Sequence, residues 1–132
     1  MIQIIILAQV DMATGLLDAI EHVLGQRPPG LAIQAIDYHA SQESLAQKLS
    51  ERLQTLHPDD PVVILADVYG SSHTNAACRL LVPEKIELVS GVNVPMLLRV
   101  LSYRHLPLGA LVQKALSGGM EGIVRAPPGQ KK

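Results

Sequence analysis

Apolar residues along the chain follow two patterns, short and nearly unbroken runs and longer stretches with helical spacing. These runs lie at residues 4–7, 62–66 and 86–89, the last interrupted only by Glu87. A further apolar segment, residues 31–36, follows the Pro28-Pro29-Gly30 turn. Such runs are typical of strands that are covered on both faces, as in a parallel sheet. We therefore predict a strand at each of these places, the first of them covering residues 2–8.

The stretches between the strands have the periodicity of amphipathic helices. Residues 12–24 place their leucines and isoleucine on one stripe, and Gly25 follows as a C-cap. Residues 43–56 show the same spacing, with Ser41 as the N-cap and Ser44 as an alternative. Three shorter helices are predicted at residues 74–82, 95–103 and 107–116.

The end of the chain is predicted to differ from the rest. Gly118-Gly119 separates the last helix from residues 121–124, whose apolar Ile123 and Val124 indicate a short edge strand. Residues 126–132 are predicted to form a disordered tail, which leaves residues 1–125 as one domain. Because strand and helix alternate throughout, we expect a doubly wound α/β fold with a mostly parallel sheet flanked by helices.

Composition narrows the class of protein. The chain has 132 residues, 48% of them hydrophobic, with no Phe or Trp, so its core must be aliphatic. A formal net charge of −1 argues against nucleic-acid binding, and a single cysteine suits a reducing compartment. The apolar runs are too short to span a membrane, and Asp11 interrupts any signal-peptide pattern. We expect a soluble, cytoplasmic protein.

Two loops should carry the chemistry, because ligands of doubly wound sheets bind beyond the carboxyl ends of the strands. These loops are residues 8–11 and 67–74. In the second loop, Gly70 and the hydroxyls of Ser71, Ser72 and Thr74 precede a helix and could bind an anion. The alternative is that Ser72 or Thr74 only caps the helix and that Asp67 is a turn residue.

Two segments carry a resemblance to a known family. They are Asp67-Val68-Tyr69-Gly70-Ser71-Ser72 with Asn75-Ala76-Ala77, and Ser90-Gly91-Val92-Asn93-Val94-Pro95-Met96-Leu97. The chain resembles, over nearly its whole length, the mannose-family enzyme IIA component of the phosphoenolpyruvate-dependent sugar phosphotransferase system. Its motifs usually read Asp-x-x-Gly-Gly-Ser-Pro-x-Asn-Ala and Gly-x-Asn-x-Pro-Met-Leu.

The resemblance implies a homodimer whose short last strand runs antiparallel and is exchanged between subunits. It also implies a phosphoryl relay without cofactors, in which the carrier protein HPr donates to a histidine that donates to enzyme IIB. By the same resemblance, contact with a transport complex at the membrane would be peripheral, without insertion.

Every departure from the family pattern lies at the phosphoryl site. The family's histidine corresponds to Gln9, which cannot form a phosphohistidine, and Val10 replaces a glycine. Asp11 adds a negative charge, although it is also a preferred N-cap for the first helix. The residue matching Asp67 normally holds the histidine ring, so Gln9 could keep a hydrogen bond to it. In the loop that borders the phosphoryl position, Ser71 and His73 replace a glycine and a proline.

The sequence therefore favours an enzyme IIA homologue that has lost phosphoryl transfer and acts as a regulatory or binding module; whether it is an enzyme stays open. One alternative is a phosphoryl carrier that uses His73, weighed against the interpretation that His73 is an exposed loop histidine. Another is a small-anion sensor built on residues 70–74. Binding of Mg²⁺ by Asp11 and Asp67 is disfavoured because hard cations need more oxygen ligands, so no metal is expected.

Overall fold

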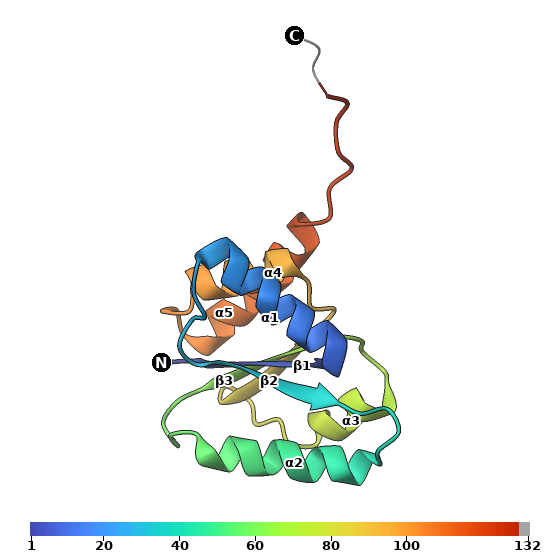
Figure 1. The fold of residues 1–132 in the computed structure, drawn as a ribbon. Coiled ribbons are helices and arrows are strands. Elements are labelled where there is room, and N and C mark those ends of the chain that lie inside the picture. The colour runs from blue at the N-terminus through green and yellow to red at the C-terminus, as the bar shows by residue number, and fades with distance from the viewer. Residues whose placement is uncertain (130–132) are drawn as a thin grey trace.

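One four-stranded parallel sheet organises the chain, and helices cover both of its faces (Figure 1). The structure, a computed structural model, describes residues 1–129. The strand order is β2-β1-β3-β4, and each neighbouring pair is parallel, as the doubly wound prediction requires. The elements are β1 (Gln3–Gln9), α1 (Val10–Leu24), β2 (Leu31–Ile36), α2 (Gln42–Thr55), β3 (Val62–Ala66), α3 (Ser72–Cys78), β4 (Ile86–Ser90), α4 (Val94–Ser102) and α5 (Leu108–Glu121).

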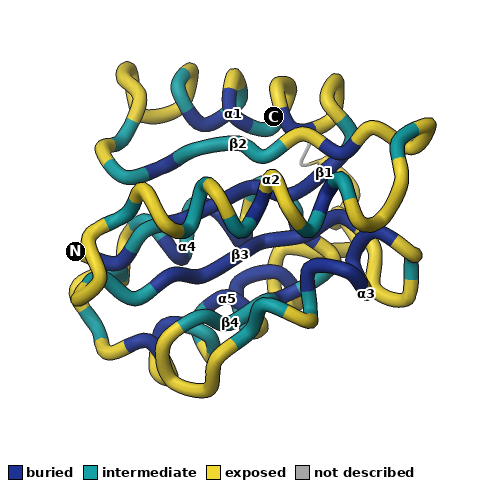
Figure 2. Tube along the Cα trace, turned by 90° about the horizontal axis from the view of Figure 1, so that it is seen from below, coloured by how far each residue is buried: buried dark blue, intermediate teal, exposed yellow. Residues whose placement is uncertain are grey.

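The central strands are buried on both faces, which explains their unbroken apolar sequence. Ile4 and Ile6 of β1 face α1, α4 and α5, while Ile5 and Leu7 face α2 and α3. Alternation of side chains along a strand thus supplies two hydrophobic layers from one run. In Figure 2 the middle strands are dark blue and the outer faces of the helices are yellow.

The predicted caps of the first two helices are confirmed in part. Gly25 ends α1 with a φ of 78°, in the left-handed region, and the Ser41 hydroxyl accepts a hydrogen bond from the Ser44 backbone N–H at 3.1 Å. The predicted N-cap at Asp11 is wrong, because α1 begins directly after β1 and its N-cap is Gln9. Asp11 lies in the first turn, where the helix dipole favours a carboxylate.

The last helix corrects the prediction for the end of the chain. Gly118 and Gly119 lie inside α5, on its buried face, instead of ending it. A Cβ on Gly118 would lie 2.5 Å from the Cβ of Arg99, so the glycines allow α5 to pack closely on α4. The prediction that the last helix ends at residue 116, before these glycines, is therefore wrong.

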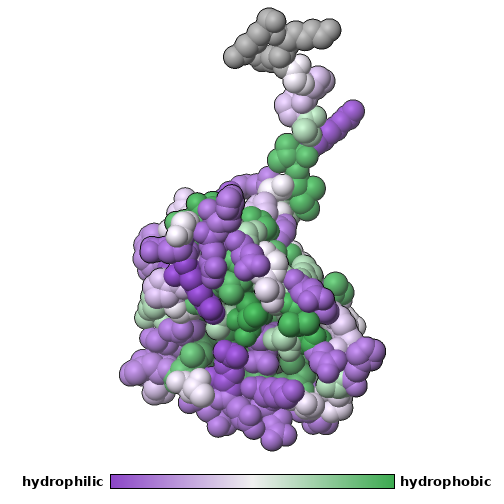
Figure 3. All heavy atoms as spheres, viewed as in Figure 1, coloured by the Kyte–Doolittle hydropathy of each residue, from purple (hydrophilic) through white to green (hydrophobic). Residues whose placement is uncertain are grey.

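The segment after α5 forms no strand in the single chain, contrary to the prediction for residues 121–124. Residues 123–129 are neither helix nor strand and run away from the body of the protein (Figure 1). Ile123 and Val124 are 81% and 70% exposed. Figure 3 shows apolar surface where this segment leaves the body. Residues 130–132, the remainder of the predicted tail, lie outside the described residues.

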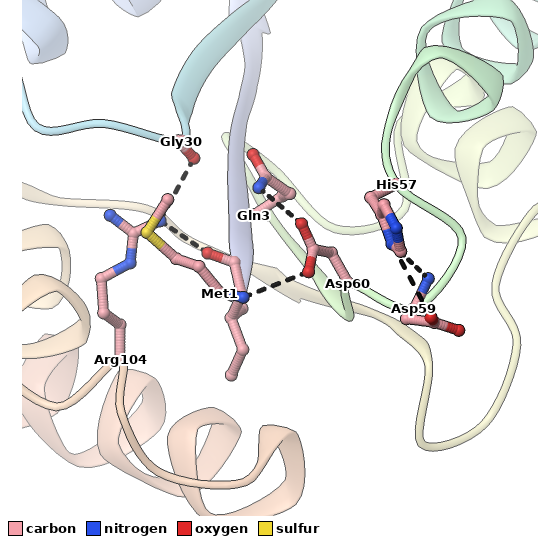
Figure 4. Close-up of polar contacts among 8 residues, drawn as sticks. Met1, Gln3, Gly30, His57, Asp59, Asp60 and Arg104 are labelled. Carbon is pink, nitrogen blue, oxygen red and sulfur yellow. Dashed lines mark hydrogen bonds and ion pairs between the residues drawn. The ribbon is translucent and has the colours of Figure 1, made fainter.

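The amino end of the sheet is held by polar contacts (Figure 4). The guanidinium of Arg104 donates to the carbonyl oxygens of Ile2 at 2.6 Å and Pro29 at 2.5 Å. The Met1 ammonium lies 3.1 Å from Oδ1 of Asp60. These contacts tie together segments at the amino ends of the strands, opposite the carboxyl ends at which ligands of doubly wound sheets bind.

Candidate functional site

The predicted site residues meet at the carboxyl ends of β1 and β3. Gln9 ends β1, and Asp67 directly follows β3. In the sheet register, Gln9 lies beside Ile36 of β2, and Leu7 lies beside Ala66 of β3. Parallel strands thus bring Gln9, Asp67 and the loop after β2 to one edge of the sheet.

Asp67 is 8% exposed, and both of its carboxylate oxygens accept hydrogen bonds. Oδ1 accepts from the backbone N–H of Val68 at 2.7 Å, and Oδ2 accepts from the hydroxyl of Tyr38 at 2.6 Å. The bond to Asp67, followed by burial and by the negative charge of that carboxylate, raises the pKa of Tyr38 to about 12. The partner of Asp67 is therefore a tyrosine from the loop after β2.

The Gln9 side chain forms hydrogen bonds with the first turn of α1 and none with Asp67. Its Oε1 accepts hydrogen bonds from the backbone N–H groups of Asp11 at 3.0 Å and Met12 at 3.2 Å, and its Nε2 donates to Oδ2 of Asp11 at 3.4 Å. The expected hydrogen bond from Gln9 to Asp67 is therefore wrong. The physical reason is that the first N–H groups of α1 lack helical partners and lie within reach of the Gln9 side chain.

The loop after β3 is closed by its own hydroxyls. The Ser71 hydroxyl accepts from the Thr74 backbone N–H at 3.1 Å and donates to the Thr74 hydroxyl at 2.8 Å, which itself donates to the Val68 carbonyl at 2.7 Å. Gly70 makes the turn with a φ of 85°. A serine does cap the helix, but the predicted caps Ser72 and Thr74 are wrong, because α3 begins at Ser72 and its N-cap is Ser71.

His73 is buried, so the interpretation as an exposed loop histidine is wrong. It is 8% exposed, and its Nε2 lies 3.2 Å from the carbonyl oxygen of Ala40. Because a carbonyl oxygen only accepts, Nε2 carries the proton in this bond. The ring also meets the Tyr38 ring edge-on, with 5.3 Å between centroids. The early start of α3 at Ser72 turns residue 73 inward, against the loop after β2.

An open groove lies beside this cluster, between the carboxyl ends of β1 and β2. Its volume is about 540 Å³, and Val10, which is exposed, forms part of its wall beside Gln9. In the described part of the chain, no three His, Cys, Asp or Glu residues are grouped as metal ligands. Among the described helices, none is long and apolar enough to cross a bilayer. The groove is lined by Gln9, Val10, Gln34, Ala35, Ile36, Asp37, Tyr38, His39 and Lys48.

Tyr38 is the site residue that the sequence analysis missed. It follows a strand, so the rule that ligands bind beyond the carboxyl ends of strands applied to residues 37–40 as well. The strand order was missing from the sequence analysis. Because β1 lies between β2 and β3, the loops after β2 and β3 lie on either side of the end of β1.

The fold and site define a doubly wound α/β domain whose polar residues gather at the carboxyl ends of adjacent parallel strands. The chain matches the family described as "PTS system fructose IIA component" over residues 3–116. It therefore belongs to the mannose-type enzyme IIA family of the sugar phosphotransferase system, which confirms the resemblance seen in its motifs.

Two sequence relatives support this assignment. The chain is 36% identical over 94 residues to the mannose-specific EIIAB component of the PTS system of Escherichia coli strain K12. That alignment covers 67% of this chain and 29% of the relative, so the chain spans less than a third of that protein. It is 30% identical over 121 residues to the fructose-specific EIIA component of Bacillus subtilis strain 168, covering 89% of this chain and 82% of the relative.

Solved structures share the fold over almost all of the chain. A phosphotransferase system component EIIA from Streptococcus agalactiae superimposes with a TM-score of 0.83 at 25% identity, covering 95% of this chain and 97% of that one. The mannose/sorbose-specific IIA subunit from Enterococcus faecalis gives a TM-score of 0.87 over 99% and 98% of the two chains. At 17% identity, the second likeness supports the fold alone.

Proposed function

We propose that this protein is an enzyme IIA homologue that does not accept a phosphoryl group at the family position and works as a regulatory or binding module. The observation that carries the proposal is the set of hydrogen bonds made by the Gln9 side chain. Its amide oxygen caps α1 through two backbone N–H groups, so the side chain at the end of β1 stabilises the helix start. An amide also lacks the nucleophilic ring nitrogen that phosphoryl transfer through histidine requires.

The partners in this proposal are HPr and enzyme IIB, or proteins that recognise the same face. Gln9 would present them with one fixed, unphosphorylated state. Exposed apolar side chains at the carboxyl end of the sheet support a protein partner: Val10 is 47% exposed and Val68 is 58% exposed. In this proposal the protein works in the cytoplasm, and its contact with a membrane transport complex is peripheral.

The proposal includes a homodimer. Among the described strands β4 pairs only with β3 and β2 only with β1, so both edges of the sheet are open, and we propose the β4 edge for the exchange. Residues 123–129 extend from the body with Ile123 and Val124 exposed, and they could add a strand to the sheet of a second copy. Light scattering should give the mass of a dimer for the full chain. Removal of residues 123–132 should give a monomer, and an unchanged mass after truncation would contradict this part of the proposal.

The test of the main proposal is intact mass after incubation with phosphoenolpyruvate, enzyme I and HPr, with an alkaline quench that preserves phosphohistidine. A histidine-bearing enzyme IIA serves as the positive control. We expect no added phosphoryl group on this chain while the control is labelled. A gain of one phosphoryl group on this chain would refute the proposal, and a His73→Ala variant would then show whether His73 carries it.

The structure does not favour the two alternatives. His73 is buried, and its Nε2 is engaged with the Ala40 carbonyl, so phosphorylation at that nitrogen would break a hydrogen bond and open the loop. An anion sensor would need free donors, whereas the Ser71 and Thr74 hydroxyls close their own loop. Calorimetry with inorganic phosphate should show no heat of binding.

A further inference from the structure

We propose that Tyr38 is a positioning residue: its hydrogen bond to Asp67 occupies the carboxylate beside the carboxyl end of β1. A reactive side chain introduced at position 9 would therefore find the Asp67 carboxylate already bonded to Tyr38. The inference rests on the proposed function and deepens it. It makes the inactivity of the site depend on two residues, Gln9 at the end of β1 and Tyr38 in the loop after β2.

The first step is the path of the hydrogen bond. β1 lies between β2 and β3 in the sheet. Tyr38 is two residues beyond Ile36, the register neighbour of Gln9, and Asp67 directly follows β3. The 2.6 Å bond from the Tyr38 hydroxyl to Oδ2 of Asp67 therefore crosses the end of β1. Gln9 and Tyr38 line the same groove, so the proposal places the Tyr38 hydroxyl between a side chain at position 9 and Asp67.

The second step is the support for Tyr38. The Tyr38 and His73 rings pack in a T-shaped arrangement, and His73 donates from Nε2 to the carbonyl oxygen of Ala40, two residues after Tyr38. The loop after β2 is thus attached to α3 by a side-chain contact and by a backbone contact. His73 is buried in this packing, so in this proposal it supports the loop and does not accept a phosphoryl group.

The third step is competition for the carboxylate. The backbone N–H of Val68 donates to Oδ1, and Tyr38 donates to Oδ2 in a short, charge-assisted bond. An imidazole at position 9 would have to displace or share that bond in order to have one ring nitrogen held. A histidine nucleophile depends on such a partner, because the hydrogen bond at one ring nitrogen sets the tautomer and leaves the other nitrogen free to react.

The chemistry that Tyr38 obstructs can be written for a Gln9→His variant. The free ring nitrogen attacks the phosphorus of the donor, forming an N–P bond from its lone pair. The bond between phosphorus and the donor breaks, and its electron pair stays with the donor. The proton on the other ring nitrogen remains, and the positive charge that develops on the ring needs a free carboxylate.

The experiment compares the labelling rates of wild type, Gln9→His, Tyr38→Phe and the double variant with phosphoenolpyruvate, enzyme I and HPr. We expect no label on wild type or Tyr38→Phe, and labelling of the double variant at least about tenfold faster than that of Gln9→His, as expected when an oriented partner is restored. A double variant that is labelled no faster than Gln9→His would overturn the inference. Label on the wild type would instead overturn the proposed function.

A second measurement does not depend on docking of HPr, which Val10 could hinder. The pKa of the introduced imidazole is measured by NMR in Gln9→His and in the double variant. We expect it to be higher in the double variant by on the order of one unit, because a freed carboxylate favours the charged ring. Equal values would overturn the inference even if neither protein is labelled.

Tyr69 provides the matched control. It is 74% exposed and, like Tyr38, lies in a loop at the carboxyl end of the sheet. Tyr69→Phe combined with Gln9→His should show the labelling rate and imidazole pKa of Gln9→His alone. If this control reproduces the effect of Tyr38→Phe, removal of any nearby hydroxyl is sufficient and the assignment to Tyr38 is wrong.

Discussion

Replacement of Gly118 by alanine should destabilise the protein although alanine is the better helix former. Gly118 lies inside α5, and a Cβ there would lie 2.5 Å from the Cβ and 2.8 Å from the Cγ of Arg99. The Cβ of Arg99 is fixed to the backbone of α4, so relief requires the two helices to separate. Overpacking of this kind costs about 1–3 kcal/mol, and the added helix propensity returns roughly 1 kcal/mol at most. We expect a net loss of up to about 2 kcal/mol.

Gly15 offers the same substitution without the contact. It lies within α1, and a Cβ there would meet no atom within 4 Å. Gly15→Ala should therefore stabilise the protein by up to about 1 kcal/mol. The free energy of unfolding is measured for both variants by urea denaturation followed by circular dichroism, at two protein concentrations so that dimerisation is separated from folding. If Gly118→Ala is as stable as Gly15→Ala, the close packing of α4 and α5 described here is wrong.

Three further predictions follow from individual contacts. The hydrogen bond from Tyr38 to Asp67 favours the neutral hydroxyl in the folded state and so stabilises the fold. Its contribution to the free energy of unfolding is about 1 kcal/mol, after allowance for a side chain that is half exposed. This contribution is fully present below pH 10 and is lost as the pH rises through about 12. In Asp67→Asn the Tyr38 pKa should fall toward its ordinary value, seen by absorbance at 295 nm after subtraction of Tyr38→Phe; an unchanged titration would contradict the assignment. Asn93→Ala should lose about 1–3 kcal/mol by urea denaturation, because Oδ1 caps α4 at the Met96 N–H and Nδ2 donates to the Gly119 carbonyl. Asn93→Asp keeps the cap but turns an acceptor toward the Gly119 carbonyl, so it should also lose stability, and a wild-type value for both variants would contradict these two contacts. The Met1 ammonium, followed by the Gln3 amide, lowers the pKa of Asp60 in the folded state. The resulting stabilisation of the fold is present above the pKa of Asp60 in the unfolded chain and is lost as the pH falls through the lower folded value. Asp60→Asn should therefore reduce the loss of thermal stability in that pH range, and an unaltered profile would argue against the contact.

The sequence alone determined the features that depend on neighbouring residues. All four strands lay where apolar segments predicted them, and in β1 and β3 the run is unbroken because burial on both faces demands apolar side chains in succession. Gly25 and Ser41 marked helix ends through conformations and hydrogen bonds that reach only a few residues. The segment around Asn93 carried the family resemblance for the same reason, since its capping pattern is contiguous in the chain.

The tertiary structure decided the site. The choice of Tyr38 as the partner of Asp67 joins residues 29 positions apart and depends on the order of the strands, which no local pattern encodes. Burial of His73 depends on the loop after β2 packing against α3. Gly118 reads as a helix breaker in isolation, yet it remains helical because its small size lets α5 contact α4. In each case, contacts between distant segments outweighed a local preference, and those contacts exist only once the sheet is assembled.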